Sequence, residues 1–367
     1  MVSRREFIVS TAALGGLAAM QACSLAKSSE SYEQAVQNTW RHGKVDAHDK
    51  LALLHELVRY ATLAPSSHNT QCWKFRIEAH AISILPDFSR RCPAVDPDDH
   101  HLFVSLGCAT ENLVQASLAN GLKGHTLFDA ARDGMLQIDL EPTKAFESAL
   151  FQAIPDRQST RAEYDGKSIS SQELKLLEQA GAGKNVQMII LTEHKAMESI
   201  LEYVVQGNTS QMNSPAFIKE LKEWIRFNAS EAVRTRDGLY SVTTGNPSIP
   251  TWLGNLFFDL FVTPKSENDK YAKQVRSSAG IAIFVSNTAN KENWIEVGRC
   301  YERFALQATA LGIKNAFLNQ PVEVSTVRPQ FAASLGIGSR RPDLVVRFGR
   351  GNKLPQSLRR PVKMVLI

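Results

Sequence analysis

FVSLGCATENLVQASLANGLK, residues 103–123, aligns without a gap with WIEVGRCYERFALQATALGIK, residues 294–314, so that Gly107 meets Gly298. Apolar residues recur in both segments with the spacing of a helix. Each segment ends in glycine followed by an apolar residue, which is typical of a helix stop and the entry to a strand. We therefore predict that each is the long central helix of one of two diverged half-domains.

The repeat extends to an earlier helix, but with a different spacing. The two central segments lie 191 positions apart. Residues 50–61 correspond to the helical pattern that begins at Glu173, but here the offset is only about 119 positions. The difference of about 70 residues indicates an insertion in the second copy. It falls between Leu191 and Trp294, where short helical patterns alternate with loop signals. We expect a lid over an active site at about residues 208–270.

Short apolar runs predict strands in both halves. Helices and strands mix in each half, and no strand is followed by Gly-x-Gly-x-x-Gly, so a Rossmann fold is disfavoured. The expected fold is α+β, with a first half at residues 46–150 and a second half at 151–367. The expected strands are residues 73–77 and 81–85 as a hairpin, then 186–191, 281–286 and 344–348.

The chain begins with Ser-Arg-Arg-Glu-Phe-Ile at residues 3–8, followed by an apolar run of small residues to Met20. This is typical of a twin-arginine signal peptide, which we place at residues 1–26 before a linker at 27–45. The run is shorter than the roughly 20 residues that span a bilayer, which argues against a membrane anchor. We expect the twin-arginine translocase as a partner during export and the periplasm as the destination. Cleavage after Ala26 and a lipid anchor on Cys23 both stay open.

Composition and charge narrow the function classes. Apolar residues make up 43% and charged residues 22% of the chain, which is typical of a globular protein. Residues 340–363 carry eight basic side chains against one acid, but only one aromatic residue, Phe348, lies among them. An exported protein rarely meets nucleic acid, so we expect no nucleic-acid partner and prefer a phosphate-bearing small ligand for part of this charge.

The sequence favours no metal site. Its five cysteines form no Cys-x-x-Cys pair. The cluster of acids and histidines at residues 96–101 precedes a helical pattern. Such a cluster is more often a turn that caps a helix than a metal site.

Two segments carry candidate binding chemistry. Residues 64–73, APSSHNTQCW, are dense in short hydroxyl and amide groups, and residues 157–161, RQSTR, place two arginines four apart. The first could surround a polar heterocycle or form an ordinary capped turn. The second could converge on one phosphate or form a solvated basic turn. The residue types alone leave both alternatives open.

Together these segments resemble the nitroreductase superfamily, whose members have an Arg-x-Ser-x-Arg phosphate motif and a Pro-Ser-Ser-x-Asn-x-Gln-Pro-Trp loop. Residues 157–161 match the first motif, and residues 65–73 match the second except that Cys72 replaces the usual proline. The resemblance covers the chain from about residue 50 and implies FMN as the cofactor. The FMN contacts that it implies are Pro65, Ser66, Ser67, Asn69, Gln71, Arg157, Ser159 and Arg161.

The order of the two motifs is reversed relative to the family. Typical members are homodimers that combine the arginine motif of one subunit with the Pro-Ser-Ser loop of the other. Here the first half has the loop and the second half has the arginine motif. The two halves would therefore mimic the homodimer and form one FMN site in a chain that can act as a monomer.

The chain is also similar to the Acg-like branch of this family, through Val-Asp-Pro-Asp at residues 95–98 and Asn-Gln-Pro-Val-Glu-Val at residues 319–324. The resemblance implies that Gln320 contacts the flavin and that the backbone N–H groups of Glu323 and Val324 face flavin N5. It also implies that Arg359 joins the phosphate site.

The expected activity is hydride transfer through FMN to a nitroaromatic, quinone or similar acceptor, with no protein nucleophile. The sequence does not identify the electron donor. A hydrolase is disfavoured because residues 66–68 lack a Gly-x-Ser-x-Gly elbow. The alternative is a flavin-binding or flavin-sequestering protein without turnover, whose pocket the inserted lid closes. The export signal favours that alternative, because NAD(P)H is not expected outside the cytoplasm.

Overall fold

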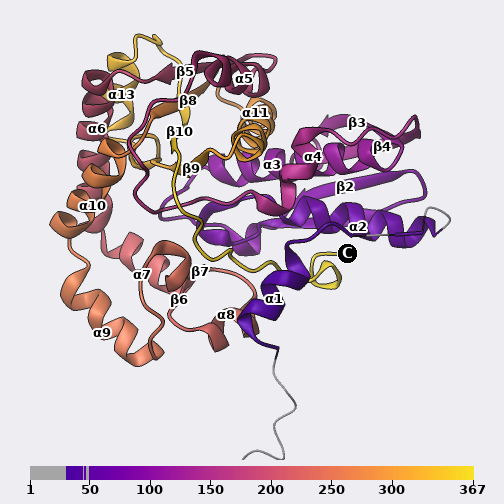
Figure 1. Cartoon of the computed structure of the whole chain (residues 1–367), viewed down its shortest axis with the longest axis horizontal. Helices are drawn as coiled ribbons and strands as arrows, with labels where there is room; N and C mark the ends of the chain where they lie inside the picture. Colours follow the sequence, from indigo (N-terminus) through magenta and orange to yellow (C-terminus); the bar gives the residue numbers. More distant parts are fainter. Residues whose placement is uncertain (1–29, 44, 47–48) are drawn as a thin grey trace, which may run out of the picture.

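The computed structural model describes residues 30–43, 45–46 and 49–367 (Figure 1). The twin-arginine motif, Cys23 and the cleavage site after Ala26 lie outside the described residues, so export stays a prediction. In the described part of the chain, no helix combines the length and the apolar character that a membrane span needs.

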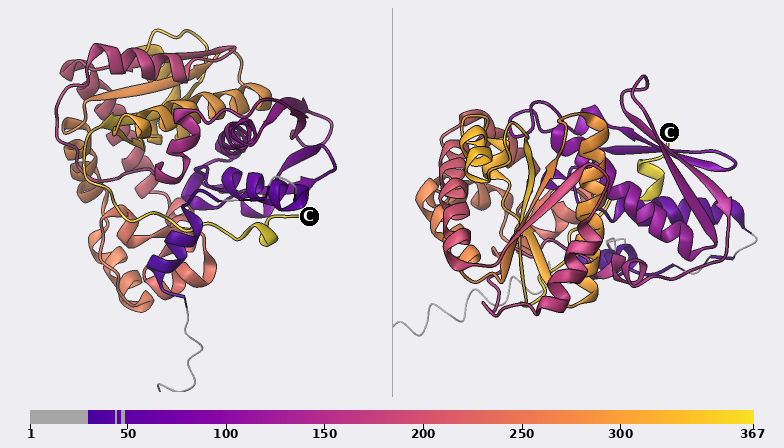
Figure 2. Two further views of the ribbon diagram at one scale, coloured as in Figure 1. Left: turned by 45° about the vertical axis from the view of Figure 1, so that its right-hand side comes forward. Right: turned by 90° about the horizontal axis from the view of Figure 1, so that it is seen from above.

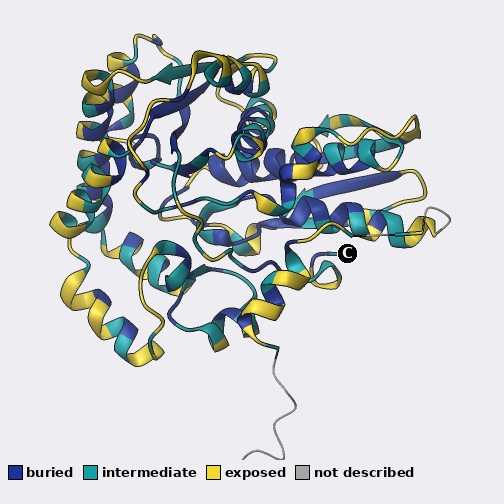
Figure 3. Cartoon of the chain, viewed as in Figure 1, coloured by how far each residue is buried: buried dark blue, intermediate teal, exposed yellow. Residues whose placement is uncertain are grey.

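The first half is a four-stranded antiparallel sheet with one long helix packed on it. The strand order is β1-β2-β4-β3, and α3 connects β2 to β3. Most residues of α3 are buried (Figure 3). The elements are α1 (Tyr32–Thr39), α2 (Lys50–Thr62), η2 (Ser67–Asn69), β1 (Trp73–Ile77), β2 (Ala81–Pro86), η3 (Phe88–Arg90), α3 (His100–Ala119), β3 (Leu122–Asp129) and β4 (Met135–Pro142).

The second half repeats this topology. Its strand order is β5-β8-β10-β9, also antiparallel throughout, and α11 connects β8 to β9 as α3 connects β2 to β3. Both central helices end at a glycine with positive φ, Gly121 and Gly312, as the sequence predicted. The predicted α+β fold with two diverged halves is confirmed. The elements are α5 (Ser171–Gly181), β5 (Val186–Leu191), β8 (Gly280–Ser286), α11 (Lys291–Ala310), β9 (Lys314–Phe317), α12 (Gln320–Glu323), α13 (Arg328–Ser334) and β10 (Pro342–Gly349).

The insertion is the connection between β5 and β8, where the first half has only the β1–β2 hairpin. The segment expected as a lid, residues 208–270, lies within this longer connection. Its first helix, α6, packs Met197 and Val204 into a core with Ile283 of β8. The following elements extend beyond the sheet (Figure 1). The elements are α6 (His194–Met212), α7 (Pro215–Trp224), β6 (Ile225–Arg226), α8 (Ala229–Thr235), β7 (Leu239–Tyr240), η5 (Ser241–Thr244), α9 (Thr251–Phe261) and α10 (Pro264–Arg276).

The two central helices touch through their glycines. A Cβ atom on Gly107 would lie 2.0 Å from the carbonyl oxygen of Ile295, and one on Gly298 would lie 2.0 Å from the carbonyl oxygen of Val104. Only glycine leaves room for such close backbone packing. Residues from both halves share one hydrophobic core around this crossing.

Two stretches of chain cross between the halves. The first runs from α4 (Ala149–Ala153) and η4 (Ile154–Asp156) to β9, where Thr160 donates its N–H to the carbonyl of Asn315 at 2.8 Å. The second is the tail after β10, which ends beside the first half (Figures 1 and 2). There Phe75 of β1 donates to Val365 at 2.7 Å and accepts from Ile367 at 3.0 Å, next to η6 (Val362–Met364).

We predict that Gly298→Ala destabilises the protein by about 2 to 3 kcal/mol, because the added methyl group must push two helix backbones apart. The free energy of unfolding in urea measures this. Ala310→Ser, an exposed position on the same helix, should change it by no more than about 0.5 kcal/mol. Equal stabilities for Gly298→Ala and the wild type would show that the helices can separate without cost.

Candidate functional site

A cavity of about 510 Å³ lies where the two halves and the insertion meet. The first half contributes the loop after α2 and one face of α3, and the second half contributes residues around β9 and α12. The insertion contributes an aromatic wall. The residues that form this wall are Phe217, Phe227, Phe257, Phe258, Phe261 and Tyr271.

A smaller cavity of about 60 Å³ adjoins the larger one. Five residues line both cavities and lie at the boundary between the two: Pro65, Ser66, Arg161, Leu239 and Phe317. The smaller cavity is the more basic of the two, because three arginines surround it. Its polar lining consists of Ser66, Asn69, Arg157, Gln158, Ser159, Arg161, Thr243, Ser357 and Arg359.

The loop after α2 has an unusual backbone. His68, Asn69 and Gln71 have φ values of 48°, 55° and 55°, in the left-handed region that residues other than glycine rarely adopt. The Ser66 hydroxyl accepts the N–H of Gln71 at 2.8 Å and closes the turn. Such a conformation persists only where the surroundings hold it in place.

Hydrogen bonds of the Asn69 and Gln71 side chains keep the loop in this conformation. The Asn69 amide donates to the carbonyl of Gly238 at 3.0 Å and accepts from Arg359 at 2.9 Å. Gln71 donates to the carbonyl of Arg236 at 2.9 Å and accepts the N–H of Arg360 at 2.7 Å. Both side chains therefore fasten the loop to the insertion and the C-terminal tail. Gln71 lines neither cavity, although Asn69 lines the smaller one.

The three arginines differ in the hydrogen bonds and ion pairs that their guanidinium groups already form within the protein. Arg157 is buried, lies 3.1 Å from a Glu302 carboxylate oxygen, and donates to the Leu63 carbonyl. Arg359 is buried and donates to the carbonyls of Leu63 and Ala64 at 3.1 Å. It also lies over the Trp40 ring, with 4.8 Å between the guanidinium carbon and the ring centroid.

Arg161 differs from both. Among the described residues, its guanidinium has no hydrogen bond and no ion pair, and burial lowers its pKa. It stays a cation, because an arginine side chain cannot be deprotonated at physiological pH. A half-buried cation that lies at the boundary of two cavities, without a hydrogen bond or ion pair among the described residues, is positioned to bind an anion.

Glu302 is the partner that the sequence did not reveal as part of the site. It is fully buried, and burial raises its pKa to about 7 although Arg157 opposes the shift. Its equivalent in the repeat, Glu111, pairs instead with Arg299 and Arg303. The alignment of the two glutamates was the available signal, but it does not predict which arginine each one contacts.

The two backbone N–H groups that we expected to face flavin N5 already form hydrogen bonds within the protein. Glu323 donates its N–H to Asn319 at 2.9 Å and Val324 donates to Gln320 at 3.1 Å, so both N–H groups belong to the turn of α12. Gln320 and the Glu323 side chain line the large cavity, whereas Val324 lines neither cavity. The Glu323 carboxylate accepts from Gln211 of the insertion at 2.6 Å.

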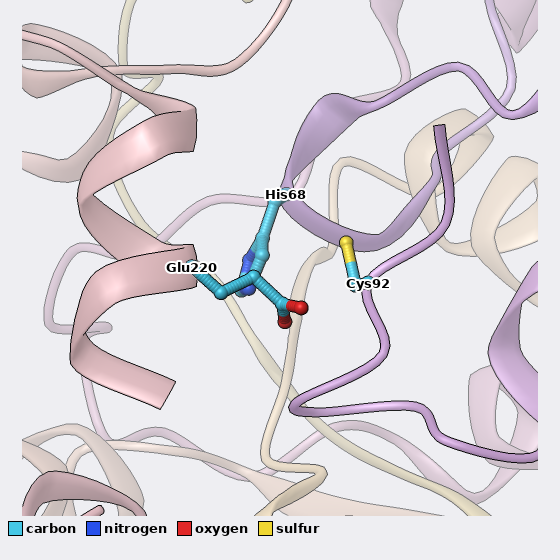
Figure 4. Close-up of side chains that lie close together, drawn as sticks. All are labelled: His68, Cys92 and Glu220. Carbon is cyan, nitrogen blue, oxygen red and sulfur yellow. The ribbon is translucent and has the colours of Figure 1, made fainter. Parts of the chain in front are cut away.

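His68 also lines the large cavity, and sequence reasoning missed it. Burial, with Arg161 nearby, lowers its pKa to about 4, so the ring is neutral at physiological pH. Its side chain points toward Cys92 and Glu220, and Glu220 comes from α7 of the insertion (Figure 4). Glu220 accepts the N–H groups of Ala94 and Val95 at 2.8 Å and 3.2 Å, which fastens the insertion to the first half.

Known proteins resemble the chain at low identity. No family model matches it. Two curated proteins of Mycobacterium tuberculosis, one from strain CDC 1551 and one from strain H37Rv, each carry the name "Putative NAD(P)H nitroreductase". Each is 24% identical over 322 residues, which cover 84% of this chain and 90% of the relative.

Solved structures also resemble the chain at low sequence identity. A "putative nitroreductase" from Anabaena variabilis covers 87% of this chain and 91% of its own, with 11% identity and a TM-score of 0.48. A nitroreductase with bound FMN from Bacteroides fragilis covers 56% of this chain and 89% of its own, with 16% identity and a TM-score of 0.35.

We predict that Glu302 makes stability fall as pH rises. Its folded-state pKa of about 7 lies above the ordinary value of 4.5. The stabilisation from its protonation is therefore complete below about pH 4.5 and is lost as pH rises through 7. The free energy of unfolding of the wild type relative to Glu302→Gln should fall by about 2 to 3 kcal/mol between pH 5 and pH 8.

Urea unfolding at both pH values measures this difference. The control is Glu178→Gln, an exposed carboxylate on α5, for which the difference should not change. A difference that is the same at pH 5 and pH 8 for Glu302→Gln would mean that this carboxylate is ionised throughout the range.

Proposed function

We propose that this chain is an FMN-dependent oxidoreductase of the nitroreductase type that binds one FMN between its two halves. The similarity to the two mycobacterial relatives and the two sequence motifs support the family. The observation that carries the proposal is Arg161, whose guanidinium has no hydrogen bond or ion pair among the described residues and which lies between a large cavity and a small basic one.

The small cavity suits the phosphate group of FMN. Arg157 Nη1 and Arg359 Nε are buried and have no hydrogen-bond partner among the described residues. Buried polar atoms are normally paired, so each of these atoms calls for an acceptor. A phosphate would accept from Arg161 and from these two atoms in charge-assisted hydrogen bonds, with the Ser159 hydroxyl beside it.

The large cavity suits the flavin ring and an acceptor. Its volume of about 510 Å³ falls in the range of small-molecule sites. Two buried atoms beside it, His68 Nε2 and Gln320 Oε1, have no partner among the described residues. A heterocycle with donors and acceptors along its edge would satisfy both, and Ser66 and Ser67 offer hydroxyls nearby.

A bound FMN would supply the redox chemistry. The residues of the chain bind the cofactor, orient it and exclude water from it. The neutral His68 ring adds no charge to the cavity. The charged residues that line it are Arg161, Glu267, Lys270 and Glu323. The aromatic wall of the insertion favours a flat apolar acceptor such as a nitroaromatic or a quinone.

The alternative is a flavin-binding or flavin-sequestering protein without turnover. The observation that favours it is the coverage of both cavities by the insertion, through Thr243 and Leu239 at the small one and the aromatic wall at the large one. Anaerobic reduction with dithionite, followed by a nitroaromatic or a quinone, separates the two functions. Rapid reoxidation supports the enzyme, whereas a flavin that stays reduced supports the binding protein.

We predict that Arg161→Ala weakens FMN binding by about tenfold to a hundredfold, because a charge-assisted hydrogen bond contributes roughly 1.5 to 3 kcal/mol. Riboflavin, which lacks the phosphate, should bind the variant and the wild type equally. Quenching of flavin fluorescence measures both affinities. The control Arg276→Ala removes an exposed arginine that pairs with Glu198 and should change neither. Wild-type FMN affinity in Arg161→Ala would place the phosphate elsewhere.

We also predict one FMN per chain in a monomeric protein. The second half cannot repeat the loop, because its helix α5 ends at Gly181 and β5 begins at Val186, whereas residues 63–72 separate α2 from β1. A second phosphate would therefore lack both the loop and an arginine motif. Heat release of the flavin, with the protein mass from light scattering, gives the ratio and the oligomeric state. A ratio near two, or flavin only in a dimer, contradicts the proposal.

A further inference from the structure

His100 and His101 open helix α3 with both imidazole rings buried. Their exposed fractions are 0% and 4%, and their ring centroids lie 4.6 Å apart. The Nδ1 atom of each ring is buried and has no hydrogen-bond partner among the described residues. An unpaired buried polar atom costs free energy, so two such atoms in neighbouring rings require a physical explanation.

Asp343 of β10 determines which nitrogen of each ring carries the proton. Its carboxylate lies 2.8 Å from Nε2 of His100, and its backbone carbonyl lies 3.3 Å from Nε2 of His101. A carbonyl oxygen only accepts, and so does an ionised carboxylate, so Nε2 is the donor in both rings. The Nδ1 atom of His100 therefore presents an unprotonated lone pair. With its Nε2 proton on the Asp343 carbonyl, His101 directs the Nδ1 lone pair toward the Glu323 carboxylate, 3.5 Å away.

Asp96 completes a set of three ligand atoms. One of its carboxylate oxygens and one ring nitrogen of each histidine lie within 4.8 Å of one another. The Asp96 carboxylate accepts the N–H groups of His101 at 3.1 Å and Leu102 at 3.0 Å, so it caps the helix as the sequence suggested. These bonds fix the direction of the carboxylate and leave further lone pairs on its oxygens.

We propose that Asp96, His100 and His101 bind one divalent first-row transition-metal ion, for which Zn²⁺ is the best-suited candidate. Two imidazole nitrogens and one carboxylate oxygen are a ligand set that proteins use for zinc and its neighbours. Ligating histidines almost always donate their other N–H to a carboxylate or a carbonyl, as both do here to Asp343. Mg²⁺ and Ca²⁺ prefer oxygen ligands alone.

The surroundings of the three ligands are compatible with a cation. His101 lines the large cavity, which provides an entry path. Glu323 Oε1 lies 3.5 Å from His101 Nδ1 and offers a further carboxylate. Two arginines also act on His100: Arg341 forms an ion pair with Asp98, and Arg328 donates to the backbone carbonyls of Val322 and Glu323. An ion at this position would link α3 of the first half to β10 of the second half through the histidines and Asp343.

A second group, His68, Cys92 and Glu220, also brings three ligand types within 4.8 Å (Figure 4). It is the weaker candidate for two reasons. Among the described residues, no carbonyl or carboxylate fixes the proton on the His68 ring as Asp343 does for the other pair. Burial also raises the pKa of the Cys92 thiol, which disfavours the thiolate that a metal needs.

The proposal does not depend on FMN binding and can be tested on the tag-free full-length protein. The protein is first treated with a chelator and then titrated with Co²⁺, a spectroscopic probe for zinc sites. We expect saturation at one Co²⁺ per chain, no thiolate-to-cobalt charge-transfer band, and displacement by Zn²⁺ but not by Mg²⁺. His101→Ala should weaken Co²⁺ binding by at least about tenfold, and Asp343→Asn by about tenfold to a hundredfold.

Two control variants should bind Co²⁺ as the wild type does. Cys92→Ser removes the thiol of the second group, and His125→Ala removes an exposed histidine beside Glu141. Circular dichroism establishes that each variant is folded, and the wild-type spectrum alone distinguishes the two groups if a variant does not fold. The absence of saturable binding, a thiolate band, or wild-type affinity in folded His101→Ala would each overturn the proposal.

Discussion

The contact of α3 with α11 at Gly107 and Gly298 is the constraint on which the rest of the structure depends. Each helix approaches the backbone of the other so closely that a single methyl group would not fit. The two helices therefore cross in direct backbone contact at this point. Because each sheet is packed on its own central helix, this crossing also sets how the two halves meet. The loop after α2 and the arginine segment before α5 then face each other across the interface.

Much of this fold follows from local sequence signals. The central helices, the β1–β2 hairpin and strands β5, β8 and β10 were predicted, because helical spacing, terminal glycines and short apolar runs mark them. Strand β4 was not predicted, although MLQIDLEP at residues 135–142 alternates in burial after a turn at Gly134. The insertion was predicted between Leu191 and Trp294, and the structure has it between β5 and β8. The narrower bounds of the lid, residues 208–270, stay a prediction.

The contacts within the candidate site could be predicted from local sequence signals only in part. The resemblance predicted Pro65, Ser66, Ser67 and Arg161 as FMN contacts, and all four line the large cavity. Their contact with FMN stays a prediction, and the residue types alone left their role open. The residue types could not show that Arg157 pairs with Glu302. Nor could they show that the Gln71 side chain forms hydrogen bonds with the backbone of Arg236 and Arg360. Those partners lie far away in the sequence, and a hydrogen bond leaves no periodic pattern. The N–H groups of Glu323 and Val324 were assigned by resemblance, and the turn of α12 uses both.

The tail after β10 has a consequence for the order of events in biosynthesis. The strained loop at His68 is held by Leu358, Arg359 and Arg360, and β1 is paired with Val365 and Ile367. These residues follow the whole first half in the chain, so they are translated after it. A nascent chain that already contains the whole first half therefore still lacks the contacts that shape its binding loop. The candidate site can form only after residues 358–367 have been translated, and a chain without these residues would lose the contacts that shape the loop.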